Sequence, residues 1–185
     1  CLYIDESQLA MLEAQMAQTG YLSGHQMSGA FQMLRSNDLL WSRLLNEYLL
    51  GERRPMNDLM AWNADVTRMP ERMHSQYLRQ LFLNDSLSEG HYRVGDRPVA
   101  LLDIGTPIFS VATLTDHVAP WRSVHKLHYL TQTEIHFVLT SGGHNAGIVS
   151  EPGRPRRRYQ SLTRSAGGKY VSPDEWLQAA PQHEG

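Results

Sequence analysis

The stretch from Pro107 to Gly147, PIFSVATLTDHVAPWRSVHKLHYLTQTEIHFVLTSGGHNAG, decides the fold. It contains two short apolar runs, Pro107 to Val111 and Glu134 to Leu139, with the length and composition of buried strands. Between them, Pro120 to Leu130 carries apolar residues at helical spacing. A strand, a helix and a second strand in this order predict a parallel pair with a right-handed crossover, and therefore an α/β fold.

Two loops follow the carboxyl ends of these predicted strands, where functional groups collect in an open parallel sheet. The first loop carries Asp116 and the second carries His144. In α/β-hydrolase-type sites, a histidine accepts a proton from the nucleophile and returns it later, while an acid orients the ring and stabilises its charged form. An acid followed by a histidine in this chain order predicts the last two members of such a set.

Asp116 also has a purely structural interpretation. It could cap the helix predicted from Pro120, and the glycines around His144 could form an ordinary strand-to-helix turn. Each loop alone leaves both interpretations open, whereas the two loops together favour a site.

The nucleophile of such a site is not evident in the sequence, because no Gly-x-Ser-x-Gly or Gly-x-Cys-x-Gly elbow occurs in it. Cys1, the single cysteine, has no strand or glycine before it. In an α/β-hydrolase fold the nucleophile and several strands precede the acid and the histidine. Since the chain also begins without Met, we expect it to be part of a longer protein, with the elbow and most of the sheet upstream of Cys1.

The remainder of the chain is predicted from its periodicity and its turn residues. A helix from Pro70 to about Asn84 should direct Met73, Tyr77, Leu78 and Leu81 inward, and Gly95-Asp96 should close a hairpin. The other predicted elements are a helix from Asp5 to Gly20, a pliable apolar loop or short helix from Tyr21 to Ser36, a helix from Asn37 or Asp38 to Gly51, and a short helix from Ser172 to Leu177.

Composition and charge exclude several classes of protein. The 185 residues have 41% apolar content and a net charge of −2, which permits a core and argues against a disordered chain or a general nucleic-acid binder. No apolar run approaches the roughly 20 residues that a membrane span requires, and the start lacks the features of a signal peptide. A cytoplasmic protein without a membrane span is therefore expected.

Four segments together resemble the signature motifs of polyhydroxyalkanoate synthases. Arg35 to Trp41 is similar to the family's Arg-Pro-Asn-Asp-Leu-x-Trp segment, and Met60 to Pro70 contains a match to its Trp-Asn-x-Asp-x-Thr-x-x-Pro segment. The loops from Asp116 to Trp121 and from Gly142 to Gly147 resemble the family's acid and histidine loops. The resemblance runs in register from about Ile4 to Pro152, with a looser match in the tail.

This resemblance implies an acyltransferase that polymerises (R)-3-hydroxyacyl-CoA into polyester and releases CoA, without a cofactor. It implies a Cys-Asp-His set in which His144 is the general base for the thiol or the incoming hydroxyl, Asp116 is its orienting or activating acid, and the cysteine lies upstream. It also implies pocket or supporting roles for His117, Trp121, Asn145 and Asp65. The partners implied are the CoA substrate, the polyester product, a second copy of the chain and proteins of polyester granules in the cytoplasm.

The resemblance further divides the chain into a helical cap region at 1–62, the C-terminal part of an α/β-hydrolase core at 63–150, and an Arg/Pro-rich tail at 151–185. For the core, two parallel strands with helices are expected.

Three alternatives remain open at this stage: an esterase or depolymerase fragment with a serine nucleophile, an inert dimerising module, and a polyanion contact by Arg154 to Arg158. His125 and His128 are two candidate metal ligands, but two are too few for a zinc site, and no metal is expected.

Overall fold

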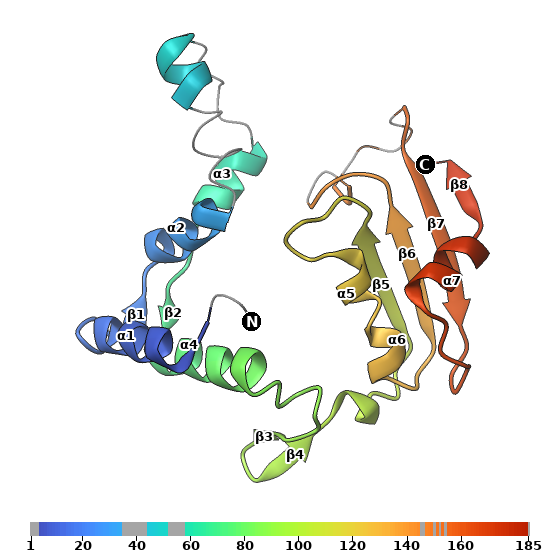
Figure 1. The fold of residues 1–185 in the computed structure, drawn as a ribbon, viewed down its shortest axis with the longest axis horizontal. Helices are drawn as coiled ribbons and strands as arrows, with labels where there is room; N and C mark the ends of the chain where they lie inside the picture. Colours follow the sequence, from blue (N-terminus) through green and yellow to red (C-terminus); the bar gives the residue numbers. More distant parts are fainter. Residues whose placement is uncertain are drawn as a thin grey trace. The chain divides into compact units, whose positions relative to one another are not determined.

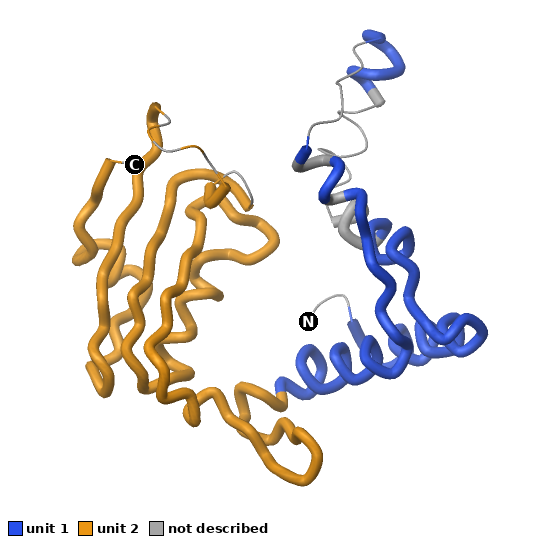
Figure 2. The backbone as a smooth tube through the Cα atoms, turned by 180° about the vertical axis from the view of Figure 1, so that it is seen from behind, with its two compact units in different colours: residues 1–85 blue, residues 86–185 orange. Residues whose placement is uncertain are grey.

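The computed structural model describes residues 4–34, 44–51, 58–144, 147–149, 151, 153 and 155–184. The chain divides into two compact units, Cys1–Asp85 and Ser86–Gly185 (Figure 2). The two units are defined by how closely their backbones pack. The cap, core and tail boundaries at residues 62 and 150 concern function and stay a prediction.

Unit 1 is mainly helical (Figure 1). Asp5 caps its first helix, because Asp5 Oδ1 accepts a hydrogen bond of 2.8 Å from the backbone N–H of Gln8. Within the segment from Tyr21 to Ser36, Gly24–Leu34 takes the helical alternative, and positions 35–43, where the helix from Asn37 or Asp38 is expected to begin, lie outside the described residues. The elements are α1 (Glu6–Ala17), β1 (Tyr21–Leu22), α2 (Gly24–Leu34), the π-helix η2 (Leu44–Leu49), α3 (Asp58–Ala64), β2 (Met69–Pro70), α4 (Glu71–Tyr77) and the π-helix η3 (Leu78–Leu83).

The helix predicted from Pro70 is present as α4 and η3, but its buried face differs from the prediction. His74 and Leu78 are buried, whereas Met73 is 58% and Tyr77 43% exposed, so the inward assignment of these two residues is wrong. His74 and Leu78 lie four residues apart and share one face, while Met73 and Tyr77 lie one position earlier, about 100° around the helix.

Unit 2 is a mixed α/β unit built on a four-stranded sheet in the order β5-β6-β7-β8. Strands β5 and β6 are parallel, as predicted, and β7 and β8 add antiparallel neighbours. The hairpin at Gly95-Asp96 is also confirmed. The elements are β3 (Tyr92–Val94), β4 (Arg97–Val99), the 3-10 helix η4 (Leu101–Asp103), β5 (Ile108–Thr113), α5 (Trp121–Val124), α6 (Leu127–Leu130), β6 (Ile135–Thr140), β7 (Arg158–Arg164), α7 (Pro173–Ala179) and β8 (Gln182–Glu184).

The expected two-stranded sheet is therefore wrong, because the tail contributes two further strands. The sequence of β7, RYQSLTR, contains a single aliphatic residue, and all three residues of β8 are exposed. Neither strand has the apolar run by which a buried strand is identified, and backbone pairing with a neighbouring strand holds each in place. The tail is consequently part of the sheet.

The core of unit 2 lies on one face of this sheet. Phe137 of β6 is fully buried, and the rings of Phe137 and Trp176 of α7 lie 5.0 Å apart. Helices α5, α6 and α7 supply the opposing side chains, and Figure 1 shows them beside the strands. The buried members of the cluster are Ala112, Trp121, Ile135, Phe137, Leu139, Trp176 and Ala180.

The single helix predicted from Pro120 to Leu130 is two short helices, α5 and α6, joined at His125 and Lys126. The backbone N–H of Lys126 bonds to Ser123 and that of His128 to His125, which is the i to i−3 pattern of a 3-10 turn. Such a turn superimposes residues three apart. It thereby brings the rings of His125 and His128 to 4.4 Å within the core.

Candidate active site

The parallel register of β5 and β6 brings the two predicted loops together. Thr113 at the end of β5 pairs with Thr140 at the end of β6, so both loops leave the same edge of the sheet. Asp116 lies three residues beyond β5, and His144 lies four residues beyond β6. A short distance along each loop is therefore enough to bring the two side chains into contact.

Asp116 and His144 form a hydrogen-bonded pair. His144 Nδ1 and Asp116 Oδ2 are 2.8 Å apart. The Asp116 side chain is only 7% exposed, whereas the His144 side chain is 45% exposed. A carboxylate on Nδ1 orients the imidazole and leaves Nε2 as the ring nitrogen available for proton transfer.

The other carboxylate oxygen of Asp116 organises its own loop. Oδ1 accepts hydrogen bonds from the backbone N–H groups of Val118, at 2.8 Å, and Ala119, at 2.9 Å. Burial of the carboxyl raises its pKa, but the Ala119 N–H, the His144 ring and the Val118 N–H outweigh this effect and hold the pKa below the usual value. Asp116 is therefore a carboxylate at neutral pH.

Asp116 is not a helix cap. Pro120 occupies the N-cap position of α5, and no side chain caps that helix. The structural interpretation of Asp116 is wrong in this respect, although the residue does close the turn that precedes α5.

The loop that carries His144 depends on two glycines. Gly142 has φ +119°, a conformation that favours glycine. At Gly147, a Cβ atom would lie 2.6 Å from Thr113 Cγ2 and 2.7 Å from the Gly143 carbonyl oxygen, so any side chain would push the loop off the end of β5. The loop and the strand end fit closely only because both positions lack a side chain.

The other four predicted site residues lie in different parts of the sequence. His117 is exposed beside Asp116, and Asn145 lies outside the described residues. Trp121 is buried in the core, with its ring centroid 6.2 Å from that of His125 and 6.3 Å from that of Trp176. Asp65 belongs to unit 1, where it is exposed. Its backbone N–H donates to the carbonyls of Ala61 and Trp62 at the end of α3. The pocket or supporting roles of these four residues stay predictions.

His125 and His128 form a buried pair in the core on the helix-covered face of the sheet. His125 is fully buried and His128 is 4% exposed, and within the described structure both nitrogens of His125 and Nε2 of His128 are without a hydrogen-bond partner. Burial lowers the pKa of both rings, that of His128 to about 4, with help from the charges of His125 and Arg164. Among the described residues, no group of three or more His, Cys, Asp or Glu side chains is placed to hold a metal ion.

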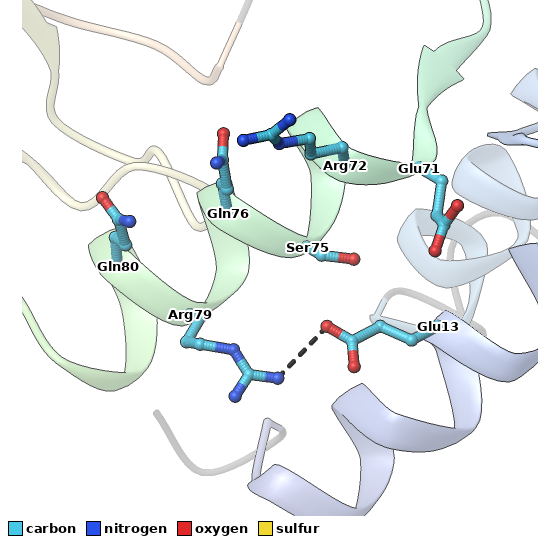
Figure 3. Close-up of a pocket in the computed structure, with 7 residues that line it drawn as sticks. All are labelled: Glu13, Glu71, Arg72, Ser75, Gln76, Arg79 and Gln80. Atoms are coloured by element: carbon cyan, nitrogen blue, oxygen red, sulfur yellow. Dashed lines mark hydrogen bonds and ion pairs between the residues drawn. The ribbon is translucent and has the colours of Figure 1, made fainter. Parts of the chain in front are cut away.

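A polar pocket in unit 1 is lined by residues of α1 and of the consecutive helices α4 and η3 (Figure 3). Arg79 of η3 bonds there to Glu13 at 3.1 Å and to Glu6 at 3.0 Å, which joins η3 to α1. These contacts are structural, and we assign the pocket no chemistry. Its lining residues are Glu13, Glu71, Arg72, Ser75, Gln76, Arg79 and Gln80.

Sequence reasoning missed the residues that hold the histidine loop. The Gly142 carbonyl accepts hydrogen bonds from Thr115 Oγ1 at 2.6 Å and from the Thr115 N–H at 3.0 Å, and Arg157 Nη1 donates to the Ser141 carbonyl at 3.0 Å. No sequence signal marks these residues. They bond to backbone carbonyls of another segment, and which carbonyls they reach depends on the pairing register of the strands, which cannot be read from the sequence.

Comparison with known proteins supports the resemblance. No family model matches the chain. A poly(3-hydroxyalkanoate) polymerase of Methylorubrum extorquens is 40% identical over 185 residues, which is 100% of this chain and 30% of that protein. Polymerase subunits of Rhizobium meliloti (strain 1021) and Cupriavidus necator are 42% and 31% identical over 85% and 100% of this chain, which covers 26% and 32% of their lengths. The chain thus spans about a quarter to a third of these curated relatives.

Proposed function

Since the chain belongs to the poly(3-hydroxyalkanoate) polymerase family, we propose that it supplies the acid and the histidine of a polyhydroxyalkanoate synthase. The complete enzyme would polymerise (R)-3-hydroxyacyl-CoA into polyester and release CoA, through a Cys-Asp-His set whose cysteine lies outside this chain. The observation that carries the proposal is the 2.8 Å contact between His144 Nδ1 and the buried Asp116 carboxylate.

In the proposed reaction, His144 Nε2 takes the proton of the cysteine thiol, and the thiolate attacks the thioester carbonyl of the substrate. The carbon–sulfur bond to CoA breaks, and the CoA thiolate leaves with the proton from His144. His144 then takes the proton of a hydroxyl group, whose oxygen attacks the enzyme-bound acyl thioester. An ester forms, and the cysteine sulfur leaves and recovers the proton.

Asp116 has a supporting role in both half-reactions. The imidazole gains a positive charge each time it takes a proton, and a carboxylate 2.8 Å from Nδ1 stabilises that charge. Since the Asp116 pKa is held below its usual value, the group is ionised when the imidazolium forms. Asp116 therefore stabilises the imidazolium while remaining deprotonated.

The proposal extends to the fold and the surroundings of the enzyme. The mixed sheet with parallel β5 and β6 and both functional loops at one edge is compatible with the C-terminal part of an α/β-hydrolase fold. Within the described part of the chain, no helix has the length and hydrophobicity to cross a membrane. We place the complete enzyme in the cytoplasm at polyester granules, as a homodimer.

Release of CoA from 3-hydroxybutyryl-CoA by the complete polymerase tests the proposal. Asp116→Asn should lower the rate by a factor of about 10⁴ and His144→Gln by at least about 10⁴, which are the losses that follow removal of the acid or the histidine from such a relay. Asp96→Asn, in the exposed turn of the β3–β4 hairpin, makes the same chemical change away from the pair and should leave the rate unchanged. Rates near that of the wild-type enzyme for both pair variants would refute the proposal. Hydrolysis of the substrate without polymer formation would favour a hydrolase instead.

A further inference from the structure

The backbone that leads into His144 is held from two sides. On one side, the Ser141 N–H donates to the Arg158 carbonyl at 2.8 Å, and Ser141 Oγ accepts from the Arg158 N–H at 3.0 Å. On the other side, the Gly142 carbonyl accepts both donors of Thr115, the residue just before Asp116. The start of β7 therefore holds Ser141, and the acid loop holds Gly142, the next residue along the chain.

Arg157 holds the same backbone through a third contact. Its Nη1 atom donates to the Ser141 carbonyl at 3.0 Å, in a partly buried position. The same atom would lie 2.5 Å from a Cβ atom at Gly142, so the guanidinium rests directly against the glycine backbone. With Thr115 on the next carbonyl, two consecutive peptide oxygens ahead of Gly143 and His144 are fixed by side-chain donors.

The position of His144 depends on this backbone. Its side chain is 45% exposed, and the hydrogen bond to Asp116 fixes the rotation of the ring. That bond cannot also fix the place of the His144 Cα atom, which follows the loop. A shift of about 1 Å in a group that transfers protons can cost a factor of about 100 in rate.

We propose that Arg157 is a positioning residue for His144, which it acts on through the Ser141 carbonyl, with Thr115 as its counterpart on the acid loop. This inference rests on the proposed function of the Asp116–His144 pair. Arg157 belongs to the Arg154 to Arg158 segment, for which a polyanion contact was an open alternative, and the inference gives this arginine a different role. Nη1 of Arg157 bonds to the Ser141 carbonyl within the chain, and this bond is the observation that favours a role in the loop over contact with a substrate phosphate.

Steady-state kinetics of CoA release by the complete polymerase separate these two roles. Arg157→Met keeps the length of the side chain and removes its donors. It should lower kcat by a factor of about 10 to 100 and change KM less than about twofold. Arg157→Lys restores a donor and a charge, and should recover part of kcat. Arg156→Asn removes an equal charge one residue away, at a φ of +67° that Asn tolerates, and should leave kcat unchanged. A raised KM at unchanged kcat would overturn the proposal in favour of anion binding.

A double-mutant cycle distinguishes positioning from a general loss of structure. If Arg157 acts by positioning His144, Arg157→Met should lower kcat less than about threefold when His144→Gln is already present. An equal factor in both backgrounds would overturn the inference. Should Arg157→Met fail to fold, Thr115→Val removes only the Oγ1 hydrogen bond and carries the same expectations. Wild-type rates for Asp116→Asn and His144→Gln would instead refute the proposed function, whereas loss in those variants with a fully active Arg157→Met refutes only the positioning role.

Discussion

Removing the buried imidazole of His128 should make the stability of unit 2 less sensitive to acid. His128 is 4% exposed, and burial lowers its pKa in the folded chain from 6.5 to about 4. Between pH 6.5 and 4, His128 binds a proton in the unfolded chain but stays neutral in the folded chain. Its contribution to the free energy of unfolding is therefore complete above pH 6.5 and is lost as the pH falls towards 4. The lowered pKa of His125 acts in the same direction.

The size of the effect follows from the difference between the two pKa values of His128. Each pKa unit corresponds to about 1.4 kcal/mol, which gives up to about 2 kcal/mol of stability lost between pH 7 and pH 5. The lowered pKa of Asp116 does not contribute in this interval, because that group loses its stabilising effect only as the pH falls below its unfolded value of 3.8. The histidine pair therefore dominates this pH range among the shifted buried groups of unit 2.

Urea unfolding followed by tryptophan fluorescence measures this difference, because Trp121 and Trp176 lie within 6.2 Å of the His125 ring. The wild-type chain and His128→Phe are compared at pH 7 and pH 5. The variant should lose up to about 2 kcal/mol less between the two values. His183→Gln, on the exposed strand β8, is the control and should behave like the wild type. Equal losses in the wild type and His128→Phe would refute the reasoning.

Three further perturbations test the core and the loops. Trp176→Ala should lower the free energy of unfolding by about 3 to 5 kcal/mol, because the side chain is 2% exposed in the core, whereas Trp62→Ala, at a position 68% exposed, should change it by less than about 1 kcal/mol in the same urea titration. Ser172→Ala removes the N-cap of α7, whose Oγ accepts from the Glu175 N–H, and should cost about 1 kcal/mol; an unchanged midpoint would contradict the cap. Gly142→Ala should lower kcat for CoA release in the complete polymerase at least tenfold, because its φ is +119° and its Cβ atom would meet Arg157; wild-type kcat would show that the loop tolerates the shift.

The sequence was informative where a pattern is local. The apolar runs of β5 and β6, the hairpin turn at Gly95-Asp96 and the short helix from Ser172 depend on residues close together in the chain, and all are confirmed. The contact between Asp116 and His144 was also predictable, because the carboxyl ends of neighbouring parallel strands meet at one edge of a sheet.

The features that sequence reasoning missed depend on pairing or on phase. Strands β7 and β8 carry no apolar run, and their place follows from backbone pairing with partners distant in the chain. On the helix formed by α4 and η3, the Met73–Tyr77 face and the His74–Leu78 face differ by a rotation of one residue. The structure buries His74, although the hydrophobic pattern favours burial of Met73.

The same distinction explains why half of the candidate site is visible in the sequence and half is not. Proton transfer requires particular side chains, so Asp116 and His144 stand out by residue type and order. Positioning can be done through a peptide carbonyl, which every residue has, so Ser141 and Gly142 give no hint of which side chains hold them. Only the register of β5, β6 and β7 shows that Thr115 and Arg157 reach neighbouring oxygens of one loop. The tail strand β7 is therefore as much a part of the proposed site as the loops that carry its acid and its base.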